Sequence, residues 1–177
     1  MDVLKRLYVA VVRSKVEYCT VGWDGSAKRN LILLEKVQRR VTRHIVGSET
    51  EYSERLANLD LLPLSYRREI LDLLFFHNCK TGVFVVPFEE SVEFTTWRGD
   101  EHFLRGRLCR TETYCGSYFN RIVKVWNQLP CETRGEPDHD IFKRKVLNFY
   151  RSKLEVFNSE NSCTWTSFCR CTRCRPT

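Results

Sequence analysis

Residues 28–46 read KRNLILLEKVQRRVTRHIV, and this stretch sets the architecture expected for the chain. At 100° per residue, its hydrophobic side chains gather within about 80° of one another on a helical wheel; they are Leu34, Val37, Val41 and Ile45. The basic side chains fall on the opposite side, and Glu35, the only acid within the helix, lies at the edge. Gly47 is a typical helix end. The pattern predicts a long helix with one buried face and one basic face.

The residues before this helix also show helical periodicity. Over residues 3–18 the hydrophobic side chains follow the i, i+3, i+4, i+7, i+8 spacing of a helix with one buried stripe; they are Leu4, Leu7, Tyr8, Val11 and Val12. A turn-rich segment, residues 22–26, is expected to separate the two helices.

Two helices are expected after it. The first covers residues 48–59, with Ser48 as its cap and Glu51 at the capping-box position. The second has Pro63 in its first turn, where a missing N–H costs little, and runs to about Lys80.

The second half of the chain is less regular. Residues 83–96 are rich in β-branched and aromatic side chains and predict extended chain or short strands, whereas residues 97–116 predict a loop with at most one strand. Ser117 is expected to cap a helix that ends before Pro130. A linker over residues 131–137 then leads to a last helix that starts at Asp138 or Asp140.

The fold class is therefore mainly α: a bundle of about five to six helices with a small irregular or β insertion and a Cys-rich tail. We expect three regions, residues 1–82, 83–158 and 159–177.

Composition supports a folded chain. The sequence has 177 residues and 42% hydrophobic residues, enough for one core rather than wholesale disorder. No apolar run approaches the roughly 20 residues that a membrane span needs, so no membrane partner is expected. The formal charge of +7 is uneven, since residues 51–100 carry nine acidic against five basic side chains. A basic surplus at both ends points to an anionic partner.

The nine cysteines are an odd number, which a closed disulfide framework does not favour. The first residues lack a continuous apolar signal-peptide core. Reduced thiols, and hence a nuclear or cytoplasmic location, are expected.

Five blocks occur in order along the chain: LYVAVVRSKVEYC with Trp23-Asp24, LEKVQRRVTR, Leu62-Pro63-Leu64 with Arg67-Arg68, Trp126-Asn127-Gln128-Leu129-Pro130, and Phe142-Lys143-Arg144. This series resembles the C-terminal part of reverse transcriptases from non-long-terminal-repeat retrotransposons, the LINE-type, jockey-like kind. The resemblance covers about residues 3–150. It implies a thumb-like helical bundle and a post-thumb region, the part of such RNA-directed DNA polymerases that grips the primer–template duplex.

The resemblance also implies what this chain lacks. The family's palm carries a Phe/Tyr-x-Asp-Asp box, and no Asp-Asp dipeptide occurs in this sequence. Polymerisation needs two metal ions held by carboxylates. The chain is therefore expected to be no enzyme by itself, and the palm and fingers of a full polymerase are candidate partners.

The basic face of residues 28–46 is the first candidate site. Its side chains carry no balancing acids and fit the phosphates of a duplex; they are Arg29, Lys36, Arg39, Arg40 and Arg43. Such contacts position a backbone and do not read bases. An ordinary solvated face is an equally open interpretation.

A second basic group surrounds aromatic side chains and comprises Arg105, Arg107, Arg110, Arg121 and Lys124, with Tyr114, Tyr118 and Phe119. Arginine with aromatics suits stacked single-stranded bases. The favoured alternative is that Phe119 and Trp126 belong to the core and that the arginines lie on a loop, because Phe119, Ile122, Val123 and Trp126 share helical spacing.

The tail holds the candidate metal site, the four thiols of Cys163, Cys169, Cys171 and Cys174. Four thiolates suffice for a structural, tetrahedral Zn²⁺ site. An unstructured tail with reactive thiols is the alternative.

Two functions remain open. The first is a nucleic-acid-binding fragment of a mobile element's reverse transcriptase. The second is a zinc-stabilised protein-interaction module or an inert transposon remnant. The sequence shows no phosphate-cradling Gly loop and no nucleophile elbow, so an enzyme is the weakest interpretation.

Overall fold

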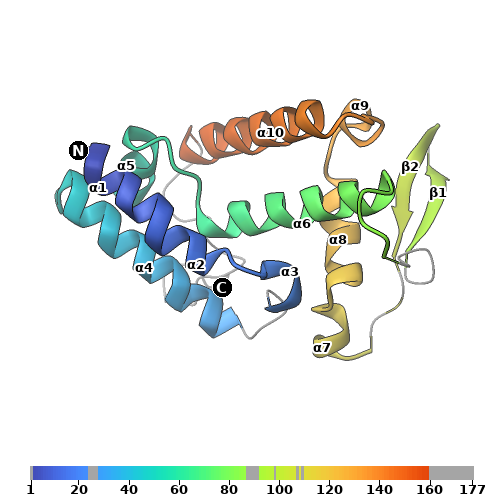
Figure 1. The fold of residues 1–177 in the computed structure, drawn as a ribbon, viewed down its shortest axis with the longest axis horizontal. Helices are drawn as coiled ribbons and strands as arrows, with labels where there is room; N and C mark the ends of the chain where they lie inside the picture. The colour runs from blue at the N-terminus through green and yellow to red at the C-terminus, as the bar shows by residue number, and fades with distance from the viewer. Residues whose placement is uncertain are drawn as a thin grey trace, which may run out of the picture. The chain divides into compact units, whose positions relative to one another are not determined.

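A computed structural model describes residues 2–23, 28–86, 92–97, 99–106, 108 and 110–159 (Figure 1). The elements are, in chain order, α1 (Asp2–Leu7), the π-helix η1 (Tyr8–Arg13), α2 (Ser14–Val16), α3 (Thr20–Trp23), α4 (Lys28–Val46), α5 (Tyr52–Asn58), α6 (Leu64–Lys80), β1 (Glu93–Trp97), β2 (Asp100–Arg105), α7 (Glu112–Cys115), α8 (Tyr118–Asn127), α9 (Cys131–Arg134) and α10 (His139–Ser159). The fold is mainly α with a small two-stranded antiparallel sheet, as expected. In the described part of the chain, no helix combines the length and hydrophobicity of a membrane span.

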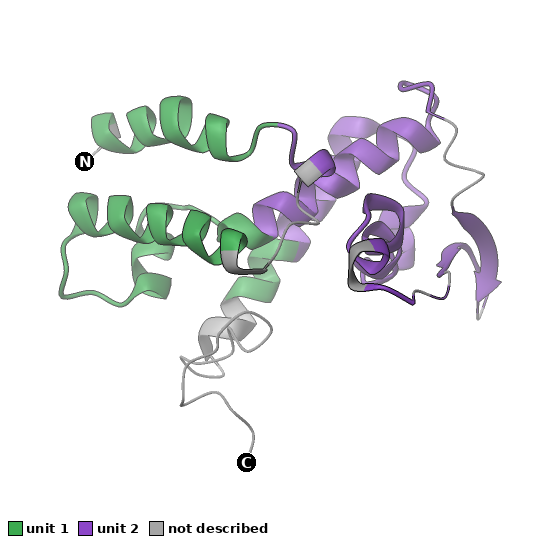
Figure 2. Cartoon of the chain, turned by 90° about the horizontal axis from the view of Figure 1, so that it is seen from below, with its two compact units in different colours: residues 1–18, 27–65, 150–177 green, residues 19–26, 66–149 purple. Residues whose placement is uncertain are grey.

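The chain forms two compact units (Figure 2). Unit 1 comprises residues 1–18, 27–65 and 150–177, and unit 2 comprises residues 19–26 and 66–149. Each unit is made of several segments, because the chain enters and leaves each unit more than once. The expected division at residues 82 and 158 stays a prediction. The long helices α6 and α10 each contribute residues to both units.

Unit 1 is built on α4 and α5. Tyr8 of η1 packs into a buried cluster with side chains of α5 and of the turn after it, namely Tyr52, Leu56, Leu59 and Leu61. Val41, Ile45 and Val46 of α4 pack against this cluster and are partly buried. Only some of the hydrophobic side chains of α4 therefore contact the core of unit 1.

Unit 2 is built on aromatic packing between α6, α8 and α10. The ring centroids of Phe76 and Trp126 lie 4.9 Å apart in an edge-to-face arrangement, and those of Trp126 and Phe142 lie 5.9 Å apart. All three side chains are fully buried. Edge-to-face and offset aromatic pairs attract each other beyond the effect of burying their surface. These three rings therefore hold α6, α8 and α10 together, whereas the sequence pattern predicts each helix separately and not their contacts.

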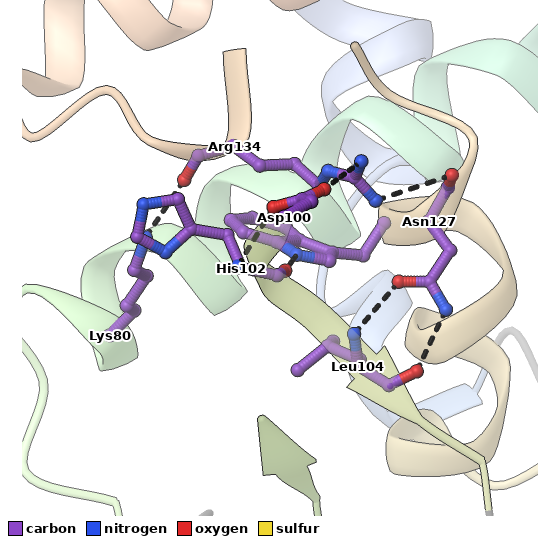
Figure 3. A network of polar contacts seen from close by, with 7 residues as sticks. Lys80, Asp100, His102, Leu104, Asn127 and Arg134 are labelled. Atoms are coloured by element: carbon purple, nitrogen blue, oxygen red, sulfur yellow. Dashed lines mark hydrogen bonds and ion pairs between the residues drawn. The ribbon is translucent and has the colours of Figure 1, made fainter. Parts of the chain in front are cut away.

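Side chains of α8 hold the β1–β2 hairpin in unit 2 (Figure 3). On the edge of β2 that β1 does not pair, the Leu104 N–H donates to Asn127 Oδ1 at 2.9 Å and Asn127 Nδ2 donates to the Leu104 carbonyl at 2.8 Å. Two residues earlier on the same edge, the backbone of His102 is also bonded. Trp126 Nε1 donates to the His102 carbonyl, and the His102 N–H donates to Asp100 Oδ1, both at 2.8 Å. Trp126 and Asn127 thus satisfy backbone groups that a third strand would otherwise pair.

Some predicted boundaries are wrong. The helix expected from residue 48 begins at Tyr52, and its N-cap is Glu51 rather than Ser48, without a side-chain capping bond. The break expected at residue 22 already contains the short helix α3, and the linker expected over residues 131–137 contains α9. Short helices of four residues have no hydrophobic period of their own, because a period needs more than one turn.

The caps of the later helices agree better with expectation. Ser117 is the N-cap residue of α8 by its backbone, although its hydroxyl donates to the Tyr114 carbonyl instead of capping the helix. Asp138 caps α10, since its Oδ1 accepts from the Ile141 N–H at 2.8 Å.

Candidate nucleic-acid interface

The basic side of α4 faces solvent. Lys36, Arg39, Arg40 and Arg43 are all exposed. Lys36, Arg40 and Arg43 follow i, i+4, i+7 spacing, so they form one line of about 10 Å along the helix. The backbone of Arg29 belongs to α4, but its side chain lies outside the described structure.

The buried side of α4 is mostly polar, which differs from the prediction. Its buried residues are Leu31, Glu35, Gln38 and Thr42. They define a direction about 90° around the helix from the centre of the predicted hydrophobic stripe. Val37 of that stripe is 39% exposed, and Leu34, Val41 and Ile45 are only partly buried. The prediction of a buried hydrophobic stripe is therefore only partly correct.

The cause of this rotation is a network of hydrogen bonds between α4 and two tyrosines. The Tyr8 hydroxyl donates to Gln38 Oε1 at 2.6 Å. Gln38 Nε2 donates to the Tyr52 hydroxyl at 3.1 Å and to the Leu62 carbonyl at 3.1 Å. The Tyr52 hydroxyl donates to Glu35 Oε1 at 2.5 Å. Buried hydroxyls need such partners, and α4 turns its polar side chains inward to supply them.

This network decides the charge of the exposed face of α4. Burial, and next the nearby Glu35, raise the pKa of Tyr52 above its ordinary value, so Tyr52 stays protonated and remains a donor to Glu35. Glu35 is the only acid in α4 and is directed into unit 1. The described solvent-facing side of α4 consequently carries basic side chains without an acidic one.

Arg39 is held on this face by an aromatic ring. Its guanidinium carbon lies 4.7 Å from the centroid of the Tyr52 ring. The guanidinium of Arg55 lies 5.7 Å from the same centroid and is bonded to the Thr50 carbonyl and the Thr42 hydroxyl. Sequence reasoning did not identify Tyr52 as part of the site, because nothing in the sequence shows which α4 residue lies against α5.

The second basic group is divided by the structure. Arg105 and Arg110 are exposed in unit 2, and Arg107 lies outside the described residues. Arg121 instead forms an ion pair with buried Asp72, its Nε lying 2.9 Å from Asp72 Oδ2. The Tyr118 hydroxyl donates to the Asp72 carbonyl, and burial raises its pKa. Arg121 and Tyr118 therefore have structural roles. Trp126 is fully buried, as the favoured alternative expects, but Arg121 belongs to α8 and pairs with Asp72 instead of lying on a loop.

The proposed zinc ligands, Cys163, Cys169, Cys171 and Cys174, lie outside the described residues. Within the described ranges, no three His, Cys, Asp or Glu side chains gather closely enough to hold a metal ion. A zinc site in the tail remains a prediction from the sequence.

Comparison with known proteins adds no identification. Neither a family model, nor a curated protein, nor a solved structure matches this chain.

Proposed function

We propose that the chain is the thumb and post-thumb part of a LINE-type reverse transcriptase and binds a primer–template duplex through its phosphates. Without the Asp-Asp box of the palm, it has no polymerase activity by itself. The proposal combines the ordered sequence blocks with the electrostatics of α4.

One observation carries the binding half of the proposal. Four exposed cations lie on α4, while the helix's single carboxylate, Glu35, is buried and bonded to Tyr52. An amphipathic surface helix commonly balances Lys or Arg with Glu one turn away. Lys36, Arg40 and Arg43 have no acid three or four residues away within α4, so their positive potential is directed at solvent and suits a polyanion.

Fluorescence anisotropy with a short RNA–DNA hybrid tests this proposal. If α4 neutralises about three phosphates, the slope of log K against log salt is about −3, and affinity falls roughly 50-fold between about 50 and about 200 mM salt. Absence of binding at the lower salt concentration contradicts the proposal.

Charge reversal locates the binding surface. Arg40→Glu with Arg43→Glu should weaken hybrid binding by at least about tenfold, because two phosphate contacts become repulsive. The matched control is Lys143→Glu with Arg144→Glu on α10, where both side chains are exposed and the charge change is the same. An equal loss in both double variants would mean that net charge, and not the α4 face, causes binding.

Exposed hydrophobic side chains in unit 1 support the second partner, the palm and fingers of a full polymerase. Leu4, Leu7 and Val11 are each more than half exposed, and Leu33 of α4 is 49% exposed. Exposed apolar groups of this kind are typical of surfaces that another protein part covers.

A further inference from the structure

A spacing that protein kinases recognise occurs four times in this sequence. Acidophilic kinases select a serine or threonine followed three residues later by a carboxylate, because basic side chains of the kinase pair with that acid. The four candidates are Ser14, Ser48, Thr133 and Ser152. Only Ser48 has two acids: Glu49 follows it directly, and Glu51 lies at the third position after it.

The structure separates Ser48 from the other three. Kinases accept their substrate as an extended segment, which a residue within a helix cannot offer. Ser14 lies in α2 with its hydroxyl donating to the Ala10 carbonyl at 2.6 Å, and Ser152 lies in α10. Thr133 lies in α9 and is 5% exposed.

Ser48 lies in the exposed bend between α4 and α5. Glu49 and Glu51 beside it are also exposed, and no hydrogen bond to another described residue holds the Ser48 hydroxyl. Glu51 makes no side-chain capping bond to α5. The hydroxyl and both recognition carboxylates are therefore accessible together.

We propose that Ser48 is a phosphorylation site for an acidophilic serine/threonine kinase, and that the phosphate weakens nucleic-acid binding by α4. The regulatory half of this inference rests on the function proposed above. In the reaction, Ser48 Oγ attacks the γ-phosphorus of ATP, and a new O–P bond forms. The bond from that phosphorus to the β,γ-bridging oxygen breaks and ADP leaves, while the hydroxyl proton passes to the catalytic aspartate of the kinase.

The position of Ser48 explains the effect on α4. The Gly47 N–H donates to the Arg43 carbonyl at 2.9 Å, so Ser48 directly follows the last turn of the helix. A phosphoserine carries about −1.5 to −2 charges at neutral pH. Together with the charges of Glu49 and Glu51, this negative charge lowers the positive potential near Arg40 and Arg43, the members of the basic line on α4 that are closest in sequence to Ser48. At screened distances of about 10 Å, we expect about three- to tenfold weaker hybrid binding.

The first test concerns the site. The full chain is incubated with casein kinase 2 and Mg²⁺-ATP, and phosphopeptides are located by mass spectrometry. We expect phosphate on Ser48. The rate of its phosphorylation should be unchanged in Ser14→Ala and at least about tenfold lower in the double variant Glu49→Gln with Glu51→Gln. Absence of phosphate on Ser48, or an equal rate in the double variant, overturns the site.

The second test compares hybrid binding before and after phosphorylation, with kinase-treated Ser48→Ala as control. A loss of affinity that occurs in the wild-type chain and not in Ser48→Ala supports the regulatory half, and equal affinities overturn it. If the unmodified chain does not bind the hybrid, the proposed function and its regulation both fail, whereas the site is still decided by the peptide masses alone.

Discussion

The side-chain amide of Asn127 exchanges two hydrogen bonds with the backbone of Leu104, one as acceptor and one as donor. An antiparallel strand would make the same pair of bonds with Leu104. Leu104 is fully buried, so neither of its backbone groups can turn to water if Asn127 is changed. The amide therefore acts as a minimal third strand for the hairpin.

Replacing Asn127 with Asp should destabilise unit 2. The substitution keeps an acceptor for the Leu104 N–H but removes the donor and sets a carboxylate against the Leu104 carbonyl. We expect the free energy of unfolding to fall by about 2 kcal/mol, measured by urea denaturation. Asn148→Asp on the exposed side of α10 makes the same chemical change and should stay within about 0.5 kcal/mol of wild type. Equal effects at the two positions would contradict the role of Asn127.

Arg121 should matter for stability rather than for nucleic-acid binding. Arg121→Met removes the guanidinium that lies 2.9 Å from the buried Asp72 carboxylate, and breaking such a pair costs about 3 kcal/mol or more. Arg105→Met and Arg110→Met, at exposed positions, should change stability by less than about 0.5 kcal/mol. Urea unfolding of the three variants provides the comparison.

The double variant Arg121→Met with Asp72→Leu sharpens this test. Removing both charges removes the ion pair as a whole, so part of the lost stability should return. If the double variant is no more stable than Arg121→Met, the ion pair is not the cause of the loss.

Stability should decrease in mild acid because of His77. This residue is fully buried, its ring stacks on Phe142 with centroids 4.2 Å apart, and its Nε2 lies 2.9 Å from the Glu136 carbonyl. Burial, and to a smaller degree the nearby His139 and Lys80, lower its pKa from 6.5, while the bond to the Glu136 carbonyl opposes the change. Below the unfolded pKa the unfolded chain therefore binds more protons than the folded one.

The stabilisation from neutral His77 is present above about pH 6.5 and is lost as pH falls through its lower folded pKa. The free energy of unfolding should fall by at most about 1.4 kcal/mol per pH unit in that window. Urea unfolding from about pH 7.5 to about pH 5 measures this. His77→Phe should reduce the slope, and His44→Gln, at an exposed position of α4, should keep it; identical slopes in both would exclude His77 as the source.

Elemental analysis tests the tail. If the four thiols of the tail bind zinc, the purified chain should contain about one metal ion per molecule. Cys171→Ser with Cys174→Ser should remove it, whereas Cys19→Ser with Cys115→Ser, at exposed positions far from the tail in sequence, should not. A metal-free wild-type chain that is fully folded would refute the zinc prediction.

The long helices were predictable because each carries its own periodic signal. The bounds of α4 and the end of α6 at Lys80 agree with the sequence pattern, and so does the capping of α10 by Asp138. A helix of many residues contains several turns, and hence several independent repeats of the same pattern.

The orientation of α4 was not predictable from its hydrophobic stripe. Its buried direction depends on Tyr8 and Tyr52, which lie 30 and 14 residues from Gln38 in the sequence. Hydrogen bonding of these two buried hydroxyls stabilises the observed orientation more than burying Val37 would stabilise the predicted one. The exposed basic residues Lys36, Arg40 and Arg43 were nevertheless identified correctly as solvent-facing, because they lie far from both the predicted and the actual buried side.

Trp126 and Asn127 illustrate the opposite case. Both belong to a five-residue block that carries the family resemblance. Helical spacing placed Trp126 in the core, but it predicted no hydrogen-bonding role for either residue. The structure supplies that role, since both side chains bond to β2. Pairing between a helix side chain and a strand edge has no periodic signature in a sequence.

The π-helix η1 gives the N-terminal helical segment a tolerance for losing one residue at one particular place. A π-helical turn holds about one residue more than an α-helical turn. Deleting a single residue between Tyr8 and Arg13 would therefore allow an uninterrupted α-helix in which Asp2–Leu7 keeps nearly the same rotation relative to the residues that follow. The same deletion in an ordinary α-helix would turn the preceding residues by about 100° and move Leu4 and Leu7 to another side. The extra residue of η1 is thus one that the helix could lose without changing which side chains it exposes.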